Sequence, residues 1–430
     1  MKRATYPRAF WPTLVIFSLV GQIAWVVENM YLNVFIYRMF NASAEAISVM
    51  VMASAVAATL TTVLIGALSD KIGRRKLFIC GGYILWGVSI TAFALIRTDV
   101  LGALLPATVS AAAAGVSLTI LLDCVMTFFG SSANDAAFNA WLTDATDDAG
   151  RGAAEGVNAM MPLVAILAVF GGFMAFDLGK ADSWTAIFLI IGVTVLLIGV
   201  AGLFLMQETA VKRPENARYF ANIVYGFRPS VVKANARLYL TLLGFAVFGI
   251  SIQIFMPYLI LYYNVSLGME NYVLIMAPAV IVASVVTAFY GRFYDRVGFQ
   301  RAVIPALLML GCGYILLYFF TNIALVFIGS LLMMSGYLSG AAVFGAMIRD
   351  CTPHGKAGMF QGLRIVGQVL IPGVVGPAVG AAVLKNAEQV LNDDGTFSFV
   401  PNANIFLAAL IAGVVLIPLL WGMARKEKAQ

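Results

Sequence analysis

Charged side chains are scarce in this chain of 430 residues: Asp, Glu, Lys and Arg make up 11% of it, whereas soluble domains average roughly 25%. Hydrophobic residues make up 61%. A soluble fold of this size would have too few charges to cover its exterior, and lipid as the surrounding solvent removes that conflict. The composition therefore excludes a soluble globular protein and indicates an integral membrane protein.

Residues that carry catalytic or metal chemistry are also few. The single histidine, His354, lies in a basic loop, so neither a catalytic triad nor a zinc cluster can be built around it. No glycine-rich phosphate loop opens a helix in a soluble region. These absences argue against an enzyme, an ATP-driven pump, a metal site and a cofactor. The cysteines have no spacing typical of a metal site or a disulfide framework; they are Cys80, Cys124, Cys312 and Cys351.

The apolar residues fall into twelve segments, each long enough to cross a bilayer, which needs roughly 20 apolar residues per helix. The fourth segment is the longest, and residues 98–110 before it are either a loop or one or two further helical turns. The sequence thus predicts an all-α membrane protein with twelve transmembrane helices. The predicted spans are 10–38, 44–68, 77–96, 111–143, 156–176, 184–206, 238–263, 271–291, 302–321, 323–348, 359–384 and 403–424.

Lysine and arginine divide unequally between the two sides of this arrangement. Twelve spans place both termini on one side, and 23 of the 27 Lys and Arg residues lie there. Because basic loops stay on the cytoplasmic side, we expect both termini in the cytoplasm and the protein in the cell membrane, surrounded by lipid. The net charge of +6 has the same origin and predicts no nucleic-acid partner. The basic residues of the opposite side are Arg38, Arg97, Lys180 and Lys385.

One stretch of sequence occurs twice. Gly, Asp, a basic residue, a second Gly and a further basic residue recur at the same spacing from Gly66 to Lys76 and from Gly291 to Arg301. A second segment also occurs once in each half, beginning at Asp144 in the first half and at Asp350 in the second. Both copies of each segment occupy the same place between two spans. The chain therefore consists of two related halves of six helices each.

The boundaries of these halves follow from the spans. We expect an N-terminal six-helix bundle over residues 1–206 and a C-terminal bundle over 238–430. Residues 207–237 form the longest connection and are expected to be a cytoplasmic linker. The two copies of the first segment lie 225 residues apart and those of the second 206 residues apart. The first half therefore carries about 19 extra residues near the connection of spans 3 and 4.

Gly66 to Lys76 resembles the loop 2–3 signature of the major facilitator superfamily. The resemblance extends over the whole chain in topology, with six plus six spans and a long central loop. It implies two pseudo-symmetric six-helix bundles around a central cavity that work by alternating access.

The charged residues of both repeated segments are interpreted as a conformational gate, because ion pairs at helix ends lock one conformation and break in another. Arg364 has a second interpretation, as a group that binds an anionic solute. The predicted gate residues are Gly66, Asp70, Gly73, Arg74, Arg75, Asp144, Arg151, Glu155, Asp295, Arg296, Asp350 and Arg364.

A narrower resemblance rests on two further segments. Asn134 to Asp144, followed by Arg151, resembles the end of helix 4 in the glycoside–pentoside–hexuronide cation symporters. Arg349 to Pro353, followed by Gly358 and by Gln361 to Arg364, resembles their helix 10–11 junction. This resemblance implies transport of a sugar together with sodium or protons.

Span 2 departs from that group. Members that use sodium have a pair of acidic residues on helix 2, whereas here Glu45 lies at the outer edge and the matching stretch holds Ala58 and Thr62. A proton is therefore the expected coupling ion, and sodium is disfavoured.

Three acidic residues remain inside the predicted spans: Glu28, Asp123 and Asp135. An ionised side chain at mid-bilayer costs at least ~2.5–3.5 kcal/mol, so such groups face a cavity, pair with another group or bind a proton. Depth places Glu28 of span 1 and Asp123 of span 4 in the same half of the membrane, where two facing carboxylates can hold a proton. The resemblance favours Asp135. Glu28 and Asp135 are equal candidates for ion coupling, and Asp123 comes next.

Amide and aromatic side chains within the spans are candidates for solute binding, because amides bind hydroxyl groups and aromatic rings stack on sugar faces. Any one tyrosine can instead be an interfacial anchor. The candidate substrate-binding residues are Glu28, Asn29, Asn33, Asp123, Asn134, Asn139, Gln253, Tyr258, Tyr337 and Gln368.

Together these features predict a secondary active transporter for a small polar solute, a sugar or glycoside, that acts as a monomer with proton coupling. The alternative is a proton-driven exporter of amphipathic compounds or drugs. A membrane enzyme lacks a catalytic cluster, and a receptor lacks loops long enough for signalling, so both are disfavoured.

Overall fold

Helices make up nearly all the regular structure in the computed structural model, which describes residues 8–106, 108–146, 151–208, 225–353, 357–392 and 395–428. The chain divides into two compact units. Unit 1 comprises Met1–Ala42 and Val56–Phe220, and unit 2 comprises Ser43–Ala55 and Ala221–Gln430. Helix α3 (Ala44–Ile72) contributes residues to both. Residues 209–224 of the predicted linker lie outside the described residues.

The described residues contain eleven helices that are long and apolar enough to cross a membrane. One of them, Val273–Phe319, has 47 residues, and Gly298 inside it has non-helical backbone angles. This helix therefore consists of two spans joined at Gly298, which confirms the predicted twelve.

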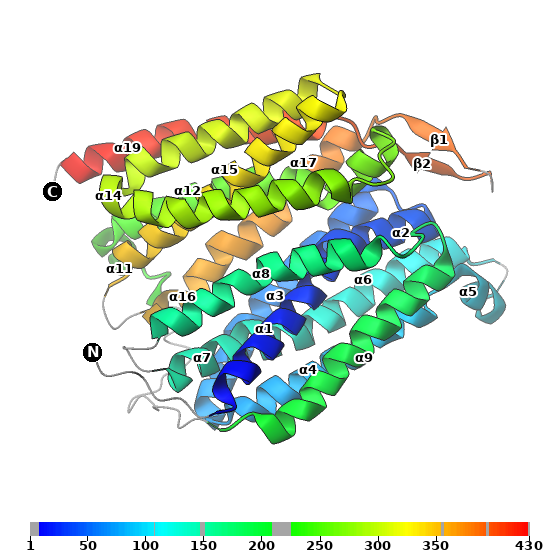
Figure 1. Ribbon diagram of the computed structural model, residues 1–430, viewed down its shortest axis with the longest axis horizontal. Helices are drawn as coiled ribbons and strands as arrows, with labels where there is room; N and C mark the ends of the chain where they lie inside the picture. Colours follow the sequence, from blue (N-terminus) through cyan, green and yellow to red (C-terminus); the bar gives the residue numbers. More distant parts are fainter. Residues whose placement is uncertain are drawn as a thin grey trace. The chain divides into compact units, whose positions relative to one another are not determined.

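In unit 1 the long helices run side by side (Figure 1). The elements are α1 (Phe10–Val26), the π-helix η1 (Val27–Tyr31), α2 (Leu32–Phe40), the later part of α3, α4 (Arg75–Ala92), the 3-10 helix η2 (Phe93–Leu95), α5 (Thr98–Leu104), α6 (Ala111–Gly130), the π-helix η3 (Ser131–Phe138), α7 (Asn139–Ala145), α8 (Arg151–Phe173) and α9 (Ala181–Leu205).

Unit 2 is built in the same way, with one small sheet added. The elements are the first residues of α3, α11 (Pro229–Ala234), α12 (Ala236–Phe255), the 3-10 helix η4 (Met256–Tyr258), α13 (Leu259–Leu261), the π-helix η5 (Tyr262–Ser266), α14 (Val273–Phe319), α15 (Ile323–Cys351), α16 (Ala357–Ile365), the π-helix η6 (Val366–Leu370), α17 (Ile371–Leu384), β1 (Gln389–Leu391), β2 (Phe397–Phe399), α18 (Asn404–Val414) and α19 (Leu416–Lys428).

Local sequence sets several helix ends. The Ser110 side chain accepts a hydrogen bond from the backbone N–H of Ala113 and so begins α6, and Asn322 begins α15 in the same way. Asn41 ends α2 in a left-handed conformation, with φ of 51°. These caps satisfy backbone groups that a helix end otherwise leaves without partners.

The sequence repeat is also a structural repeat. Gly73 and Gly298, 225 residues apart, have φ of 72° and 77°, in the left-handed region that glycine adopts readily. Thr146 and Thr352, 206 residues apart, each donate to the carbonyl four residues before them, at 2.7 and 2.6 Å. Both repeated segments thus fold alike in the two units.

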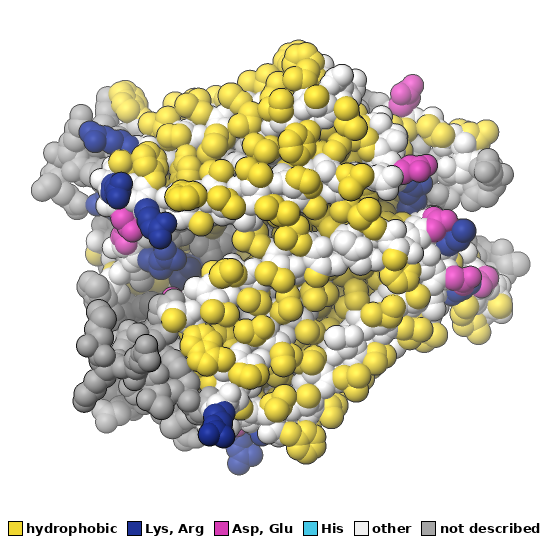
Figure 2. Space-filling view, viewed as in Figure 1, with side chains coloured by type: hydrophobic (Ala, Val, Ile, Leu, Met, Phe, Trp, Pro, Cys, Tyr) yellow, Lys and Arg dark blue, Asp and Glu magenta, His cyan; other side chains and the backbone are white. Residues whose placement is uncertain are grey.

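Apolar side chains cover the visible sides of the helices in both units, while charged side chains gather near the helix ends (Figure 2). Leu121 in α6 and Leu308 in α14 are 63% and 62% exposed although they lie in the middle of long helices. Apolar surface that extends along whole helices is typical of helices surrounded by lipid.

Small residues allow helices to pack closely inside each unit. A Cβ at Gly87 in α4 would lie 2.4 Å from the backbone nitrogen of Leu196 in α9. A Cβ at Gly336 in α15 would lie 2.4 Å from the backbone nitrogen of Leu310 in α14. Such contacts are typical of helix packing in membranes.

Two connections contain structure that the sequence left open or missed. Residues 98–110, predicted as a loop or a few helical turns, contain the short helix α5. The polar segment after span 11 forms an antiparallel hairpin in which Leu391 pairs with Phe397. Its turn contains Gly395 with φ of 78°, so a local turn preference makes the hairpin.

Candidate functional site

Spans 1 and 4 bring a carboxylate and a hydroxyl together inside unit 1. Glu28 lies in η1, Thr127 lies in α6, and both side chains are buried. The Thr127 hydroxyl donates a hydrogen bond to Glu28 Oε1 over 2.8 Å. Asp123, also buried, lies one helical turn before Thr127 on the same side of α6. Glu28 thus contacts span 4 at Thr127, one helical turn after Asp123, the residue that the sequence predicted to face it.

A cavity of about 10 Å³ borders Glu28, which is room for roughly one water molecule. The other lining residues are Ala24, Val27, Leu32, Ile90, Phe93, Met126, Phe188 and Ile191. All of these are apolar, so the surroundings make a charge on Glu28 costly and strengthen its hydrogen bond.

Asp135 lies in a different environment, in η3. The Ser131 hydroxyl donates to Asp135 Oδ2 over 3.0 Å. The neighbouring Asn134 is buried, and its Oδ1 lies 3.3 Å from the Tyr83 hydroxyl. A Cβ at Gly21 would lie 2.5 Å from that hydroxyl, so glycine in span 1 makes room for it. Asp135 and Glu28 are therefore held by separate sets of partners.

The remaining amide candidates of unit 1 differ in exposure. Asn29 and Asn139 are exposed, and each donates through Nδ2 to a carbonyl of its own helix, Trp25 O at 2.8 Å and Asp135 O at 3.1 Å. Asn33 is fully buried, and its Oδ1 has no hydrogen-bond partner among the described residues. Polar side chains inside membrane spans usually face protein or a water-filled cavity.

In unit 2 the candidates are less concentrated. The buried Tyr258 donates its hydroxyl to Ala44 O over 2.9 Å, so this group is engaged within the unit. Gln253, Tyr337 and Gln368 are half-buried.

Four described segments are π-helical, and most of the candidate residues inside the spans lie in or next to them. Glu28 and Asn29 lie in η1, Asn134 and Asp135 in η3, and Gln368 in η6. The fourth, η5, follows Tyr258 in span 7. π-Helices are rare and concentrate at functional sites. The π-helices could not be predicted from the sequence, because no residue pattern specifies the wider turn.

The predicted gate of unit 1 contains a buried arginine between two carboxylates. Arg75 lies 2.5 Å from Asp70 Oδ1 through NH2 and 3.1 Å from Asp144 Oδ2 through Nε. Its NH1 also donates to Ser69 Oγ over 2.6 Å. The sequence predicted all three charged residues for the gate but not their pairing. We call this group the Arg75 clamp.

The other gate residues of unit 1 lie around the clamp in sequence. Gly73 forms the left-handed turn before α4, and Gly66 lies one turn before Asp70 in α3. Arg74 and Glu155 are exposed. The side chain of Arg151 lies outside the described residues.

Unit 2 makes the corresponding contact between helix ends differently. Asp295 and Arg296 are exposed on α14, and the Tyr294 hydroxyl donates to Asp350 Oδ2 over 2.5 Å. Arg364 is half-buried, and its Nε has no hydrogen-bond partner in the described part of the chain. The sequence left open a pairing of Arg364 with Asp350 or with Asp144. The described residues of unit 2 contain no ion pair between Arg364 and Asp350, and Asp144 is paired with Arg75.

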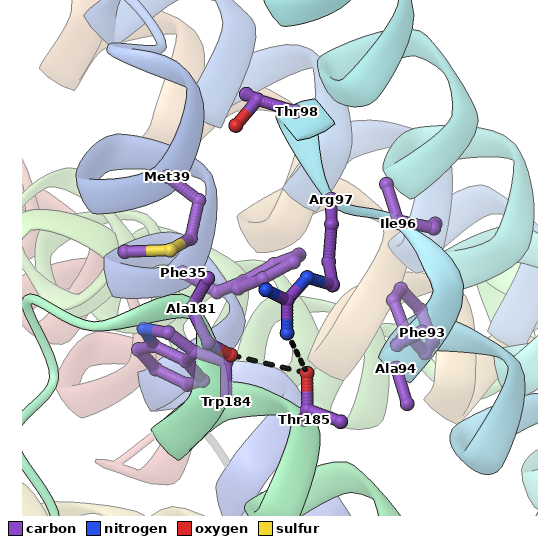
Figure 3. Close-up of a pocket in the computed structure, with 10 residues that line it drawn as sticks. All are labelled: Phe35, Met39, Phe93, Ala94, Ile96, Arg97, Thr98, Ala181, Trp184 and Thr185. Carbon is purple, nitrogen blue, oxygen red and sulfur yellow. Dashed lines mark hydrogen bonds between the residues drawn. The ribbon is translucent and has the colours of Figure 1, made fainter. Parts of the chain in front are cut away.

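A further polar cluster was not predicted. Arg97, between span 3 and α5, lies 3.0 Å from Asp99 Oδ1 through Nε and 2.6 Å from Asp182 Oδ1 through NH1. The hydrogen bonds to Asp99 and then Asp182 raise the pKa of Arg97, and the bond to Arg97 lowers the pKa of Asp99. Figure 3 shows the guanidinium directed at Thr185, to which Arg97 donates a hydrogen bond over 3.2 Å. Arg97, Trp184 and Thr185 line a cavity of about 10 Å³.

The described residues contain no group of three or more His, Cys, Asp or Glu that could hold a metal ion. The polar groups that do gather are buried carboxylates with hydroxyl donors, which can bind and release a proton, and a clamp of ion pairs, which can open and close.

Comparison with known proteins agrees with this architecture. The profile of the Major Facilitator Superfamily matches residues 13–340. No curated protein sequence matches the chain. The fold is similar to the crystal structure of the nucleoside transporter NupG, with a TM-score of 0.69, 12% identity, and coverage of 96% of this chain and 98% of that one.

Two further solved structures are similar. One is a bacterial homolog to the human lysosomal transporter Spinster, inward-facing and unoccupied, with a TM-score of 0.71, 15% identity and 98% of both chains covered. The other is the xylose transporter XylE from E. coli, partially occluded and inward open, with a TM-score of 0.68, 13% identity, and 97% of this chain and 99% of that one covered. At these identities the likeness shows the fold alone.

Proposed function

Because the chain belongs to the major facilitator superfamily, we propose that it is a secondary active transporter that moves a small polar solute together with a proton by alternating access. The proposed solute is a sugar or glycoside, in keeping with the resemblance of Asn134 to Asp144 to the glycoside–pentoside–hexuronide symporters. Two of the similar structures are described as transporters of nucleosides and of xylose, which are hydroxyl-rich solutes. They support this choice only through the shared fold.

The observation that carries the proposal is the hydrogen bond from Thr127 to Glu28. It joins span 4 to span 1 in an apolar interior, where an ionised carboxylate is stable only with such a donor. Protonation of Glu28 removes the charge and weakens this bond, so the protonation state and the packing of the two spans are linked. That linkage is what a proton-coupled conformational change requires.

The side chains proposed to bind solute are Asn29 and Asn139, which are exposed in unit 1, and Gln253, Tyr337 and Gln368, which are half-buried in unit 2. Amides and a phenol supply donors and acceptors for hydroxyl groups.

The proposed setting is the cell membrane, with both termini in the cytoplasm because most lysine and arginine residues lie on the side of the termini. The proposed bundles are 1–206 and 238–430, with the connection 207–237 facing the cytoplasm, and the protein is proposed to act as a monomer. The Arg75 clamp and its counterpart in unit 2 then form the cytoplasmic gate.

Glu28→Gln tests the proposal, because glutamine keeps the size and hydrogen bonding of a protonated glutamate. In proteoliposomes this variant is expected to retain solute exchange but to lose accumulation driven by a pH gradient. Glu45→Gln, at an exposed position, is the matched control and should behave as wild type. If Glu28→Gln keeps proton-driven accumulation, the coupling role passes to Asp135, and Asp135→Asn must then abolish it.

The same assay distinguishes the proposed symporter from the alternative, a proton-driven exporter of amphipathic compounds. An exporter would accumulate a hydrophobic dye on the acidic side of the membrane and would leave sugars, glycosides and nucleosides unmoved.

A further inference from the structure

The two units make the same helix-end contact with different chemistry. In unit 1 the contact joins the repeated loop to Asp144 at the end of span 4 through the Arg75 guanidinium, 3.1 Å from Asp144 Oδ2. In unit 2 it joins the loop to Asp350, the repeat partner of Asp144, through the Tyr294 hydroxyl, 2.5 Å from Asp350 Oδ2. Tyr294 lies 225 residues after Ser69, which is also part of the Arg75 clamp.

The residue that corresponds to Arg75 explains the difference. At the same offset of 225 residues the chain has Gln300, which has no charge. Gln300 is half-buried, and its Nε2 has no hydrogen-bond partner among the described residues. Unit 2 therefore retains the two carboxylates, Asp295 and Asp350, but has a neutral glutamine at the position where unit 1 has the arginine that joins its two carboxylates.

We propose that Tyr294 is a gating residue that takes the place of this arginine. Its neutral hydroxyl holds one carboxylate, Asp350, and we call this hydrogen bond the latch of unit 2. In unit 1 the charged Arg75 is paired with two carboxylates. One hydrogen bond to a carboxylate that is itself exposed is easier to break than a buried arginine with two carboxylates and a hydroxyl. The latch of unit 2 thus needs less free energy to open than the clamp of unit 1.

The neighbourhood of the latch supports a role in opening. Asp350 is followed by Cys351, which packs against a small core at the end of unit 2 that includes Leu238, Ile348 and Phe360. Breaking the bond from Tyr294 frees the end of α15, to which this core is attached. Cys351 is half-buried there, so its exposure reports whether the end of the unit is closed.

The test uses the full-length protein with Cys351 as the reporter and N-ethylmaleimide as the probe. In a background in which the other three cysteines are replaced (Cys80→Ala, Cys124→Ala, Cys312→Ser), Tyr294→Phe is expected to raise the labelling rate roughly 10-fold, the effect of losing one hydrogen bond to a charged group. Tyr290→Phe, one helical turn earlier on α14 and also half-buried, is the matched control and should leave the rate unchanged.

Rescue separates a gating role from general destabilisation. Gln300→Arg in the Tyr294→Phe background supplies the cation found in unit 1 and should return labelling and turnover toward wild type, with unchanged solute affinity throughout. If Tyr294→Phe folds poorly, Asp350→Asn weakens the same bond from the other side and should raise labelling in the same direction. Labelling of Tyr294→Phe at the wild-type rate, or a rise that Gln300→Arg does not reverse, would overturn the proposal.

This inference rests on the proposed alternating access but not on proton coupling. A wild-type protein that shows no proton-driven uptake would refute the proposed coupling, whereas the labelling series, measured without solute or gradient, would still decide the role of Tyr294.

Discussion

Replacing the carboxylates of the Arg75 clamp one at a time should slow transport to different degrees. The Arg75 side chain is 5% exposed, whereas Asp70 is 45% exposed and Asp144 is 20% exposed. Exposed ion pairs contribute about 0–1 kcal/mol, and loss of the partner of a buried charge costs roughly 3–5 kcal/mol. We therefore expect Asp70→Asn to cost about 1 kcal/mol and Asp144→Asn about 2 kcal/mol, with the double variant near the buried-charge value.

In the proposed gating role the clamp is formed in one conformation and broken in another, so these energies translate into rates. A loss of about 1 kcal/mol corresponds to a turnover reduced roughly 5-fold, and about 2 kcal/mol to roughly 30-fold. Turnover is measured as solute exchange in proteoliposomes, and affinity as solute binding in detergent. Affinity should change less than 2-fold, because by this account no clamp residue touches solute. Lys71→Gln, at an exposed neighbouring position, is the control.

Two results would refute this reasoning. If Asp70→Asn slows turnover more than Asp144→Asn does, burial does not set the strength of the two pairs. If affinity falls as much as turnover in either variant, the loop contacts solute and is not a gate.

Three further predictions concern other parts of the chain. Thr127→Val removes the hydroxyl that donates to the buried carboxylate of span 1, and proton-driven uptake should fall roughly 10-fold. The control is Thr194→Val, which should leave uptake unchanged because the Thr194 side chain is exposed and bonded to a carbonyl of its own helix. Gly298→Ala places a side chain at φ of 77° and should lower the free energy of unfolding by about 1 kcal/mol. Gly291→Ala, which has equal space but a helical backbone, should not lower it. Equal effects of the two variants in denaturant titrations would contradict the argument from backbone strain. The pKa of Asp99 is lowered in the folded protein, so the stability it provides is present above its ordinary value of 3.8 and is lost as pH falls through the folded value. Melting curves between pH 2 and 6 should show an acid-induced loss that Asp99→Asn reduces, and identical curves would mean that the contact with the neighbouring guanidinium does not contribute.

The fold was predictable because the bilayer imposes a strong constraint on sequence. Span length and the scarcity of charge define where helices cross, and the recurrence of Gly66 to Lys76 at Gly291 to Arg301 defines two halves. The structure confirms the all-helical architecture and the count of spans. It also shows Gly73 and Gly298 in the same unusual backbone conformation, which explains why the repeat keeps glycine at both places.

The site was predictable only in its residue types. Glu28 and Asp135 stand out as acids within apolar spans, but the sequence does not say that Thr127 binds one and Ser131 the other. Such pairs join residues on different helices or depend on the rotation of a π-helical turn, and hydropathy carries no information about rotation. Tyr258 illustrates the limit, since its hydroxyl is bonded to the carbonyl of Ala44.

The Arg97 cluster was missed for a related reason. Arg97, Asp99 and Asp182 read as loop charges, and only the fold brings the end of span 3 beside the start of α9.

The central claim, proton-coupled transport of a polar solute, is tested most directly by uptake of radiolabelled sugars and glycosides into proteoliposomes under an imposed gradient. We expect an inward pH gradient to drive accumulation and an inward sodium gradient at constant pH to drive none, because the only acidic residue of span 2 is Glu45 at its edge. Sodium-driven accumulation at constant pH, or uptake indifferent to both gradients, would contradict it.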